Sequence, residues 1–382
     1  MDKPLVLLII PTLSIGGAER FAVEMATHLP SHGFDTKLIT LFERGPLFDE
    51  VRQRNIRWKQ LLPSRHASRI DLVRRLSLQI YGQGVGRGAQ GVGKIHHAPR
   101  PTPHAPLIIH TNLFGPDFWT AVVRSMHAHI RPQPIFISTV QNIDNEDGFI
   151  RHAARRWAAH RFDRLIGLSE ATAAYAKEDL RVPASRVQYI DGMNFLQSDS
   201  RPDVPMHQPV RFVSVGRLVE QKGFDIALRA LAKVPPPWHY TIIGSGPLEH
   251  ELKELSEKLG IAARMEWIPG TLDTGEVLRG SDLMLFPSRW EGLGSVSIEA
   301  ACIGLPVLTS DIPAIQSVFP ASQRIKVGDV SAWTQAMTRF IHDPSKAFAM
   351  AKDRAPAIKK RFDPASIAGK YAEVYRKMLK RA

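Results

Sequence analysis

Two glutamates, Glu291 and Glu299, bracket a glycine-containing turn, Glu291-Gly-Leu-Gly294, in the second half of the chain. The apolar run 282–287 predicts a buried strand ended by proline, and residues 296–302 predict a helix. A helix N-terminus beside glycines offers free amides to an anion. A carboxylate at the same turn repels anions, so we expect Glu291 to accept hydrogen bonds from neutral hydroxyls. A sugar joined to a diphosphate supplies both kinds of group.

Two cations stand five residues apart in an earlier turn, Gly216-Arg-Leu-Val-Glu-Gln-Lys222. Arg217 offers a fork of donors to a phosphate, and Lys222 adds a point charge. Taken singly, each is more often a surface cation. Together with the amides of residues 292–295 they would neutralise a diphosphate leaving group, and Ser295 or Ser297 would cap the helix that follows.

Polar residues also follow two predicted strands in the first half. His110 and Asn112 come at the end of strand 107–110, and Gln141 follows strand 135–140. Ligands in open parallel sheets bind beyond the carboxyl ends of strands, where these residues would lie. For any one of them a structural hydrogen bond and a catalytic role both remain open.

The elements that must position these residues follow a repeated strand, loop and helix pattern, which predicts parallel sheets. We predict an N-terminal Rossmann-like domain over 1–197, a polar, proline-containing linker over 198–209 and a second such domain over 210–363. Two doubly wound domains would face each other across a cleft. Residues 364–382 predict a final helix that packs its apolar side back toward the N-terminal domain.

Residues 81–106 interrupt this rhythm with a glycine- and proline-rich segment. Its stretch Gly88-Ala-Gln-Gly-Val-Gly-Lys94 meets most of the Walker phosphate-binding pattern. Ile95 stands where a Mg²⁺-binding Ser or Thr belongs, and prolines follow where a helix must begin. We therefore interpret the segment as a flexible loop.

Composition indicates a globular protein of more than one domain: 382 residues, 44% apolar and 23% charged. No run approaches the roughly 18 uninterrupted apolar residues of a spanning helix. Leu5–Ile10 is interpreted as a first buried strand and not a signal peptide, because Pro11 ends it early. The single cysteine, Cys302, excludes an internal disulfide and fits a reducing cytosol.

The formal net charge of +13 requires an explanation in terms of partners. Residues 52–100 carry eleven Lys or Arg against one acid, Asp71, and residues 149–163 predict a basic helix. Phosphorylated substrates and anionic lipid both attract such a surface, and a solvated face with a packed Trp is the alternative for the helix. Nucleic-acid binding is not expected, because aromatic platforms are not interleaved with the cations.

With these motifs in view, the chain resembles the retaining glycosyltransferases of family 4, which have the GT-B fold. The resemblance is carried by four stretches: Val215-Gly-Arg-Leu-Val-Glu-Gln-Lys-Gly223, Ile243-Gly-Ser-Gly-Pro247, Phe286-Pro-Ser-Arg-Trp-Glu-Gly292 and Gly16-Gly-Ala-Glu19. Glu291 and Glu299 also have the family's spacing. The match is strong over 210–311 and looser before Asn194.

The resemblance implies roles for individual residues on the donor side. Arg217 and Lys222 would hold the diphosphate, Glu291 would bind sugar hydroxyls, and Glu299 would bind the ribose. Amides of Gly292, Leu293, Gly294, Ser295 and Val296 would meet sugar and phosphate, and the backbone at Gly216, Gly244, Gly246 and Pro269 would border the nucleotide.

On the acceptor side, the resemblance implies that His110, Asn112, Gly16 and Gly17 would face the reacting carbon. No metal or cofactor is implied; the donor, expected to be a UDP-sugar, is a co-substrate. Two positions depart from the family pattern: Gln141 stands where His is frequent, and residues 191–194 read Asp-Gly-Met-Asn.

The function implied is transfer of a hexosyl or N-acetylhexosaminyl unit to a lipid-linked or cell-envelope glycan, as in lipopolysaccharide synthesis. The enzyme would be cytoplasmic and peripheral on an anionic membrane surface through its basic N-terminal half. Two alternatives stay open: an inactive sugar-nucleotide-binding subunit, and another GT-B enzyme of the phosphorylase or epimerase type.

Overall fold

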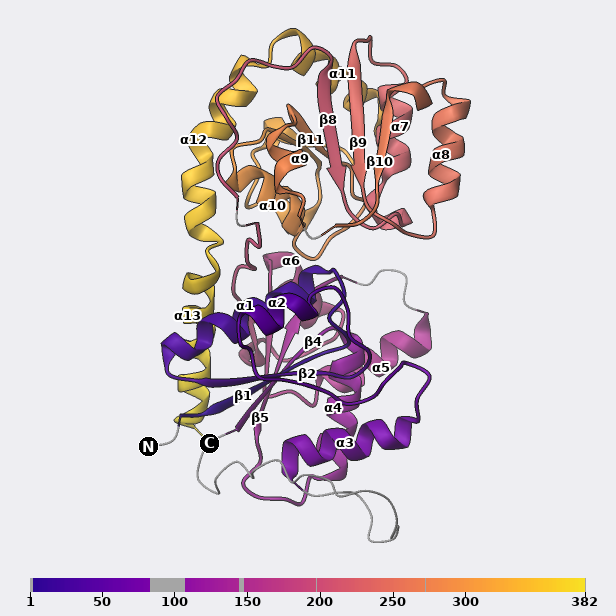
Figure 1. The fold of residues 1–382 in the computed structure, drawn as a ribbon. Helices are drawn as coiled ribbons and strands as arrows, with labels where there is room; N and C mark the ends of the chain where they lie inside the picture. The colour runs from indigo at the N-terminus through magenta and orange to yellow at the C-terminus, as the bar shows by residue number, and fades with distance from the viewer. Residues whose placement is uncertain (1–2, 83–106, 144–147, 197, 272, 382) are drawn as a thin grey trace. The chain divides into compact units, whose positions relative to one another are not determined.

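The computed structural model describes residues 3–82, 107–143, 148–196, 198–271 and 273–381. The chain divides into two units, each built around a parallel sheet (Figure 1). Unit 1 comprises Met1–Asp191 with Pro364–Ala382, and unit 2 comprises Gly192–Asp363. The predicted pair of Rossmann-like α/β domains is confirmed.

The sheet of unit 1 has seven parallel strands in the order β3-β2-β1-β4-β5-β6-β7. Continuous apolar runs form its centre, as expected for strands covered on both faces. Its strands are β1 (Leu5–Ile10), β2 (Asp35–Thr40), β3 (Trp58–Gln60), β4 (Leu107–Asn112), β5 (Ile135–Val140), β6 (Arg164–Gly167) and β7 (Val187–Tyr189). The order reverses between β1 and β4, which places a topological switch point there.

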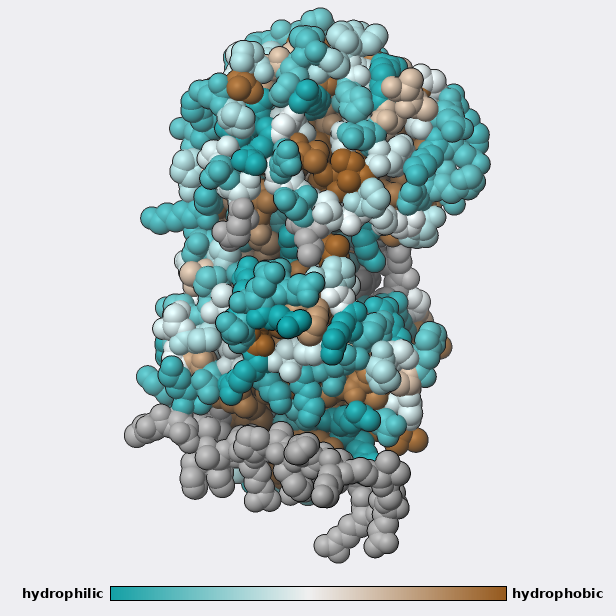
Figure 2. Space-filling model, viewed as in Figure 1, coloured by the Kyte–Doolittle hydropathy of each residue, from teal (hydrophilic) through white to brown (hydrophobic). Residues whose placement is uncertain are grey.

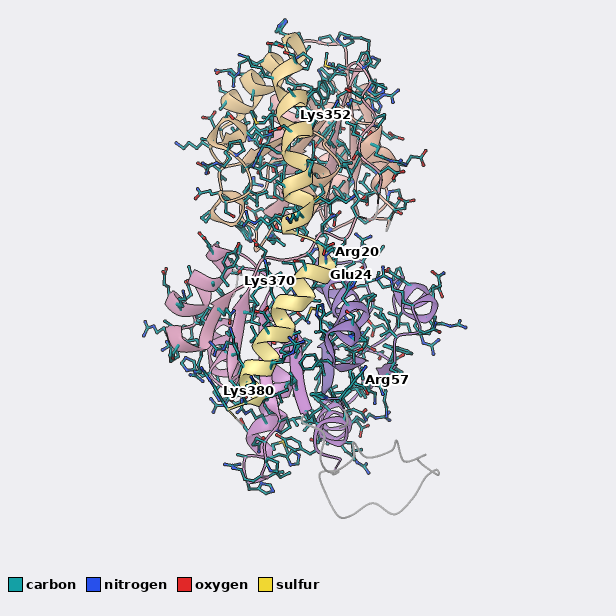
Figure 3. All side chains as sticks on the ribbon, turned by 90° about the vertical axis from the view of Figure 1, so that its left-hand side faces the viewer. Arg20, Glu24, Arg57, Lys352, Lys370 and Lys380 are labelled. Atoms are coloured by element: carbon teal, nitrogen blue, oxygen red, sulfur yellow. The ribbon has the colours of Figure 1, made fainter. Side chains whose placement is uncertain are left out.

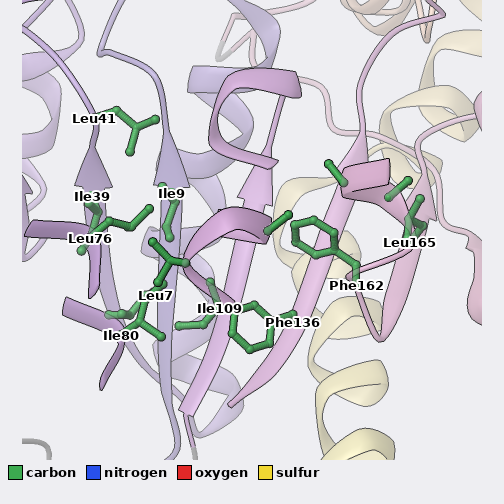
Figure 4. Packing of buried hydrophobic residues seen from close by; sticks show 14 of the residues in the cluster. Leu7, Ile9, Ile39, Leu41, Leu76, Ile80, Ile109, Phe136, Phe162 and Leu165 are labelled. Atoms are coloured by element: carbon green, nitrogen blue, oxygen red, sulfur yellow. The ribbon is translucent and has the colours of Figure 1, made fainter. Parts of the chain in front are cut away.

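Helices cover the faces of this sheet and bury a core that includes Leu7, Ile9, Ile109 and Phe136 (Figure 4). They are α1 (Gly17–His28), α2 (Phe48–Gln53), α3 (Arg69–Tyr81), α4 (Phe114–Met126), α5 (Phe149–Ala159), α6 (Glu170–Glu178) and α13 (Pro364–Leu379). Sequence reasoning missed α3. Tyr81, predicted to open the loop, is the last residue of that helix, and the rest of the loop beyond Gly82 lies outside the described residues.

The sheet of unit 2 has six parallel strands in the order β10-β9-β8-β11-β12-β13, so its switch point lies between β8 and β11. Its strands are β8 (Val210–Val215), β9 (Trp238–Ile243), β10 (Met265–Ile268), β11 (Leu283–Phe286), β12 (Val307–Ser310) and β13 (Arg324–Ile325). Its helices are α7 (Phe224–Leu231), α8 (Glu249–Lys258), α9 (Gly275–Arg279), α10 (Ser295–Cys302), α11 (Val330–His342) and α12 (Ser345–Arg361).

The boundary between the units lies earlier than the predicted linker at 198–209. That segment belongs to unit 2, because Arg201 anchors it to the end of the sheet. The Arg201 backbone amide donates to Ile303 O at 2.6 Å, and its guanidinium pairs with the buried Asp282 carboxylate at 3.1 Å. The chain therefore enters unit 2 at Gly192 and leaves it after Asp363.

The last helix, α13, belongs to unit 1, where it packs along α1 (Figure 3). Its apolar side is buried as the sequence indicated, with Ile367, Tyr371 and Tyr375 all fully covered. Phe21 of α1 meets the Tyr371 ring edge-on, with ring centroids 5.4 Å apart. Arg20 and Glu24 of α1 are labelled next to α13 in the same view.

Candidate functional site

The strongest candidate site lies at the switch point of unit 2, where the loops after β8 and β11 meet. The β8 loop carries Arg217 and Lys222, and the β11 loop carries Glu291. Lys222 Nζ contacts Glu291 Oε1 at 2.5 Å, and Ser288 Oγ donates to the same oxygen at 2.8 Å. Glu291 is only 7% exposed. The structure thus brings into contact two residues to which the sequence assigned separate roles, Lys222 on the diphosphate and Glu291 on the sugar.

A second set of contacts fastens these two loops to each other. The Arg289 backbone amide donates to Gln221 O at 2.7 Å, and Gln221 Nε2 donates to Trp290 O at 2.9 Å. The Arg289 guanidinium donates one hydrogen bond to each carboxylate oxygen of Asp225, both at 2.9 Å. Such a forked pair fixes direction as well as distance.

Arg289, Asp225, Gln221 and Ser288 were not named as site residues by sequence reasoning. Their contribution is positional, because they hold Lys222 and Glu291 in register. Arg289 was visible within the Phe286–Gly292 motif, but its partner Asp225 lies 64 residues earlier in the chain. No local spacing pattern connects the two.

The N-terminus of α10 opens directly beside this cluster. Its N-cap, Gly294, has φ +75°, a left-handed conformation that glycine adopts without strain, and no side chain caps the helix. The expectation that Ser295 or Ser297 caps it is wrong, because Ser297 Oγ donates to Gly294 O at 2.7 Å. The Ser297 backbone amide also bonds to Gly294 O, at 3.0 Å, so the first-turn amides left for another acceptor are those of Ser295 and Val296.

The glycine turns after β8 and β9 lie against each other. A Cβ on Gly244 would come within 1.9 Å of Gly216 O, and one on Gly246 within 2.5 Å of Leu218 O. These glycines are thus required for backbone packing, whatever nucleotide contacts they also make. Pro269, at the end of neighbouring β10, is exposed.

The remaining donor-side residues occupy distinct environments. Arg217 is exposed at the rim of the β8 loop, and Leu293 is buried. Glu299 lies inside α10 and is buried. Burial, with the Glu299 charge one helical turn away, raises the pKa of the Cys302 thiol to about 12. That thiol is therefore an inert part of the interior and no nucleophile.

In unit 1 the adjacent carboxyl ends of β4 and β5 bring two strand-end amides together. Gln141 Nε2 donates to Asn112 Oδ1 at 3.0 Å. Asn112 is fully buried, and within the described part of the chain its Nδ2 has no hydrogen-bond partner. The next residue, Leu113, has φ +75°, an uncommon conformation for a residue with a side chain. Asn112 therefore has an unused hydrogen-bond donor at the carboxyl edge of the sheet.

The predicted catalytic role of His110 is contradicted. Strand β4 continues two residues beyond His110 to Asn112, so His110 lies within the strand and is fully buried. Its Nδ1 is 2.6 Å from Tyr375 Oη and its Nε2 is 2.7 Å from Thr139 Oγ1. Burial lowers the pKa of the imidazole to about 3. With both nitrogens engaged by the protein, His110 anchors α13 to the sheet.

Gly16 and Gly17 form the entry to α1, with Gly16 as the N-cap and no side-chain cap. The Glu19 carboxylate folds back onto this turn: a Cβ on Gly16 would meet Glu19 Oε2 at 2.3 Å. Ser14 Oγ donates to Glu19 Oε1 at 3.1 Å. A negative charge already at this helix end suits the turn to neutral hydroxyls better than to phosphate.

Comparison with known families gives two matches that cover the two halves of the chain. The sequence model of the family described as "Glycosyltransferase Family 4" matches residues 15–191, and that of the family described as "Glycosyl transferases group 1" matches residues 198–359.

Individual relatives from named organisms match as well. The lipopolysaccharide core biosynthesis mannosyltransferase LpsB of Rhizobium meliloti is 28% identical over 244 residues, 59% of this chain and 68% of that protein. An uncharacterized glycosyltransferase of Haemophilus influenzae is 26% identical over 304 residues, 77% of each chain.

Among solved structures, Anabaena Alr3699/HepE in complex with UDP-glucose has a TM-score of 0.80 at 17% identity, covering 98% of this chain and 99% of that one. WaaG, a glycosyltransferase involved in lipopolysaccharide biosynthesis, has a TM-score of 0.69 at 16% identity, covering 97% and 99%. At these identities the likeness establishes the fold.

Proposed function

Because the chain belongs to the group 1 glycosyltransferases of family 4 and has their GT-B fold, we propose that it moves a hexosyl or N-acetylhexosaminyl unit from a UDP-sugar, with retention, to a lipid-linked or cell-envelope glycan. The observation that carries the proposal is the Lys222, Glu291 and Ser288 cluster beside the uncapped N-terminus of α10. This cluster places an anion site next to a carboxylate, Glu291, that can accept hydrogen bonds from sugar hydroxyls. UDP-glucose, bound by the structural relative from Anabaena, contains both partners.

In the proposed reaction the bond between the sugar's anomeric carbon and the diphosphate breaks, and the acceptor oxygen bonds to that carbon on the same face. Negative charge then grows on the departing diphosphate. Lys222, Arg217 and the first-turn amides of α10 would stabilise that charge, while Glu291 would hold the sugar through its hydroxyls. The departing phosphate oxygen would take the acceptor's proton, so no separate protein base is needed.

The acceptor class is inferred from the relatives, since R. meliloti LpsB is a lipopolysaccharide core mannosyltransferase. Asn112 of unit 1, with its unpartnered buried Nδ2, is the residue we assign to an acceptor or sugar oxygen. No helix among the described residues is long and apolar enough to cross a membrane. We propose action at the cytoplasmic face, where sugar nucleotides are made.

A donor panel tests this proposal directly. Purified protein is incubated with UDP-, GDP- and ADP-sugars, and release of the nucleoside diphosphate is measured with and without acceptor glycan. We expect Lys222→Ala and Glu291→Gln each to lower kcat/KM by roughly 100-fold or more. Lys253→Ala is the matched control, because it breaks a lysine–glutamate pair of the same unit, on α8, with Lys253 and Glu249 2.7 Å apart.

Two outcomes would overturn the proposal. Failure to bind or cleave any donor would remove the enzyme assignment, whereas donor binding without transfer would favour an inactive sugar-nucleotide-binding subunit. Nuclear magnetic resonance of the first-formed product assigns the anomeric configuration, and an inverted linkage would refute retention.

A further inference from the structure

A hollow lined by aromatic and glycine residues lies in unit 1, between the first turns of α4 and α5. Its volume is about 710 Å³, and it is lined by Phe114, Gly115, Phe118, Trp119, Gly148, Phe149, Ile150, Arg151 and Ala154. Helices α4 and α5 pack on each other, and α3 packs on α4 (Figure 1). Phe118, one of the lining residues, meets the Trp157 ring in a tilted arrangement with centroids 5.8 Å apart. None of these residues contributes to the donor site described above.

Two large apolar side chains project from this hollow. Phe149 is 88% exposed and Ile150 is 84% exposed, and both stand at the start of α5. Moving one such side chain from water to an apolar medium is favourable by about 1.5–3 kcal/mol. Most of the surface that Figure 2 views is hydrophilic, and its apolar groups include a patch on unit 2. An exposed pair beside an aromatic hollow therefore indicates a contact surface.

Arginines surround this apolar surface. The guanidinium carbons of Arg151 and Arg155 lie 5.5 and 4.7 Å from the centroid of the Phe114 ring. On α3, the Arg69 guanidinium lies 5.9 Å from the Trp119 ring centroid. α5 itself, Phe149–Ala159, contains Arg156 as well and no acidic residue. Cations that flank aromatic and aliphatic side chains on one helix match the boundary between lipid phosphates and acyl chains.

We propose that this surface docks unit 1 onto a bilayer of anionic phospholipids. Phe149 and Ile150 enter the acyl region of the bilayer. The hollow between α4 and α5 accepts the lipid acyl chains that they displace, and the guanidinium groups of Arg151, Arg155 and Arg156 contact the lipid phosphates. Charge complementarity selects the anionic bilayer over an uncharged one. Docking requires both apolar insertion and basic charge; the three acids that precede the helix in the sequence, Asp144, Glu146 and Asp147, lie outside the described residues.

Vesicle sedimentation tests the proposal with the full chain. Vesicles of phosphatidylcholine alone and of phosphatidylcholine with phosphatidylglycerol are mixed with protein over a series of salt concentrations. We expect binding to the phosphatidylglycerol vesicles that weakens as salt rises. Phe149→Ser with Ile150→Ser should weaken it at least about tenfold, and Arg155→Gln with Arg156→Gln should weaken it and reduce its salt dependence.

Val327→Ser is the matched control, because Val327 is an exposed apolar residue of unit 2 outside the hollow. It should bind vesicles as the parent chain does. Nucleotide-sugar cleavage without vesicles checks that each variant is folded. Equal binding by the Phe149/Ile150 double variant and the parent would overturn the proposal, as would equal binding to both kinds of vesicle. A lipid-free dimer that the double variant dissociates would assign the surface to a second copy of the chain instead.

Discussion

Replacing His110 by glutamine should remove a large part of the protein's sensitivity to acid. The imidazole pKa is lowered to about 3 by burial, from an ordinary value near 6.5. At a pH between these two pKa values, His110 is protonated in the unfolded chain and neutral in the folded chain. The stability contributed by neutral His110 is therefore present above pH 6.5 and is lost as pH falls toward 3.

The magnitude follows from linkage. At one pKa unit per 1.36 kcal/mol, the full effect would reach about 5 kcal/mol at very low pH. At pH 5 it amounts to about 2 kcal/mol, and at pH 7.5 it is close to zero. The difference in unfolding free energy between pH 7.5 and pH 5 should thus be smaller in His110→Gln by about 2 kcal/mol.

Urea titrations with pulse proteolysis measure this difference, with fragments of unit 1 followed by mass spectrometry at matched ionic strength. Tyr375→Phe is the matched variant, because it removes the hydroxyl that contacts Nδ1 at 2.6 Å and leaves the imidazole in place. It should lower stability by about 1 kcal/mol at every pH and keep the parent's slope. Parallel pH profiles for the parent chain and His110→Gln would refute the reasoning.

Other perturbations give further expectations. Gly244→Ala should cost about 1–3 kcal/mol in thermal or urea unfolding, because its Cβ would meet Gly216 O at 1.9 Å, whereas Gly280→Ala, whose Cβ would be 3.4 Å from its nearest neighbour, should be tolerated; equal effects would contradict this. Arg289→Ala and Asp225→Ala should each raise the donor KM, and a double-mutant cycle should show coupling of about 1 kcal/mol between them. Strictly additive effects of the two substitutions would show that this ion pair does not fasten the β8 and β11 loops to each other. Burial raises the pKa of Asp117 to about 6, so this carboxyl contributes stability that is present below pH 3.8 and is lost as pH rises through 6. Asp117→Asn should therefore abolish a fall of about 2 kcal/mol in the free energy of unfolding between pH 4 and pH 7.5, measured by urea unfolding. An unchanged fall would show that another group causes it.

Much of the fold followed from local patterns. The apolar run at β1 and the glycine turns after β8, β9 and β11 were sufficient to predict two doubly wound units, because strand, turn and helix signals are local in sequence. Helix α12 was missed, since Pro356 lies inside it and its first turn has no side-chain cap.

The candidate site was predicted unevenly for a physical reason. The structure brings Lys222 and Glu291 into contact, and both come from turns with recognisable motifs. His110 was misassigned because the end of a strand is decided by its neighbours: the pairing of β4 with β5 runs as far as Asn112 and Thr139. Alternation of residue types cannot locate that end to within two positions.

The return of α13 to unit 1 has a consequence for how the chain is made. All of unit 2 is synthesised before residues 364–382, which complete unit 1 by burying Tyr371 and Tyr375 against the sheet. During translation, unit 2 can therefore reach its final structure while the surface of His110 and Phe21 in unit 1 still lacks its cover. The first domain to begin is the last to be finished, and a nascent chain stopped short of α13 would expose that surface to chaperones and proteases.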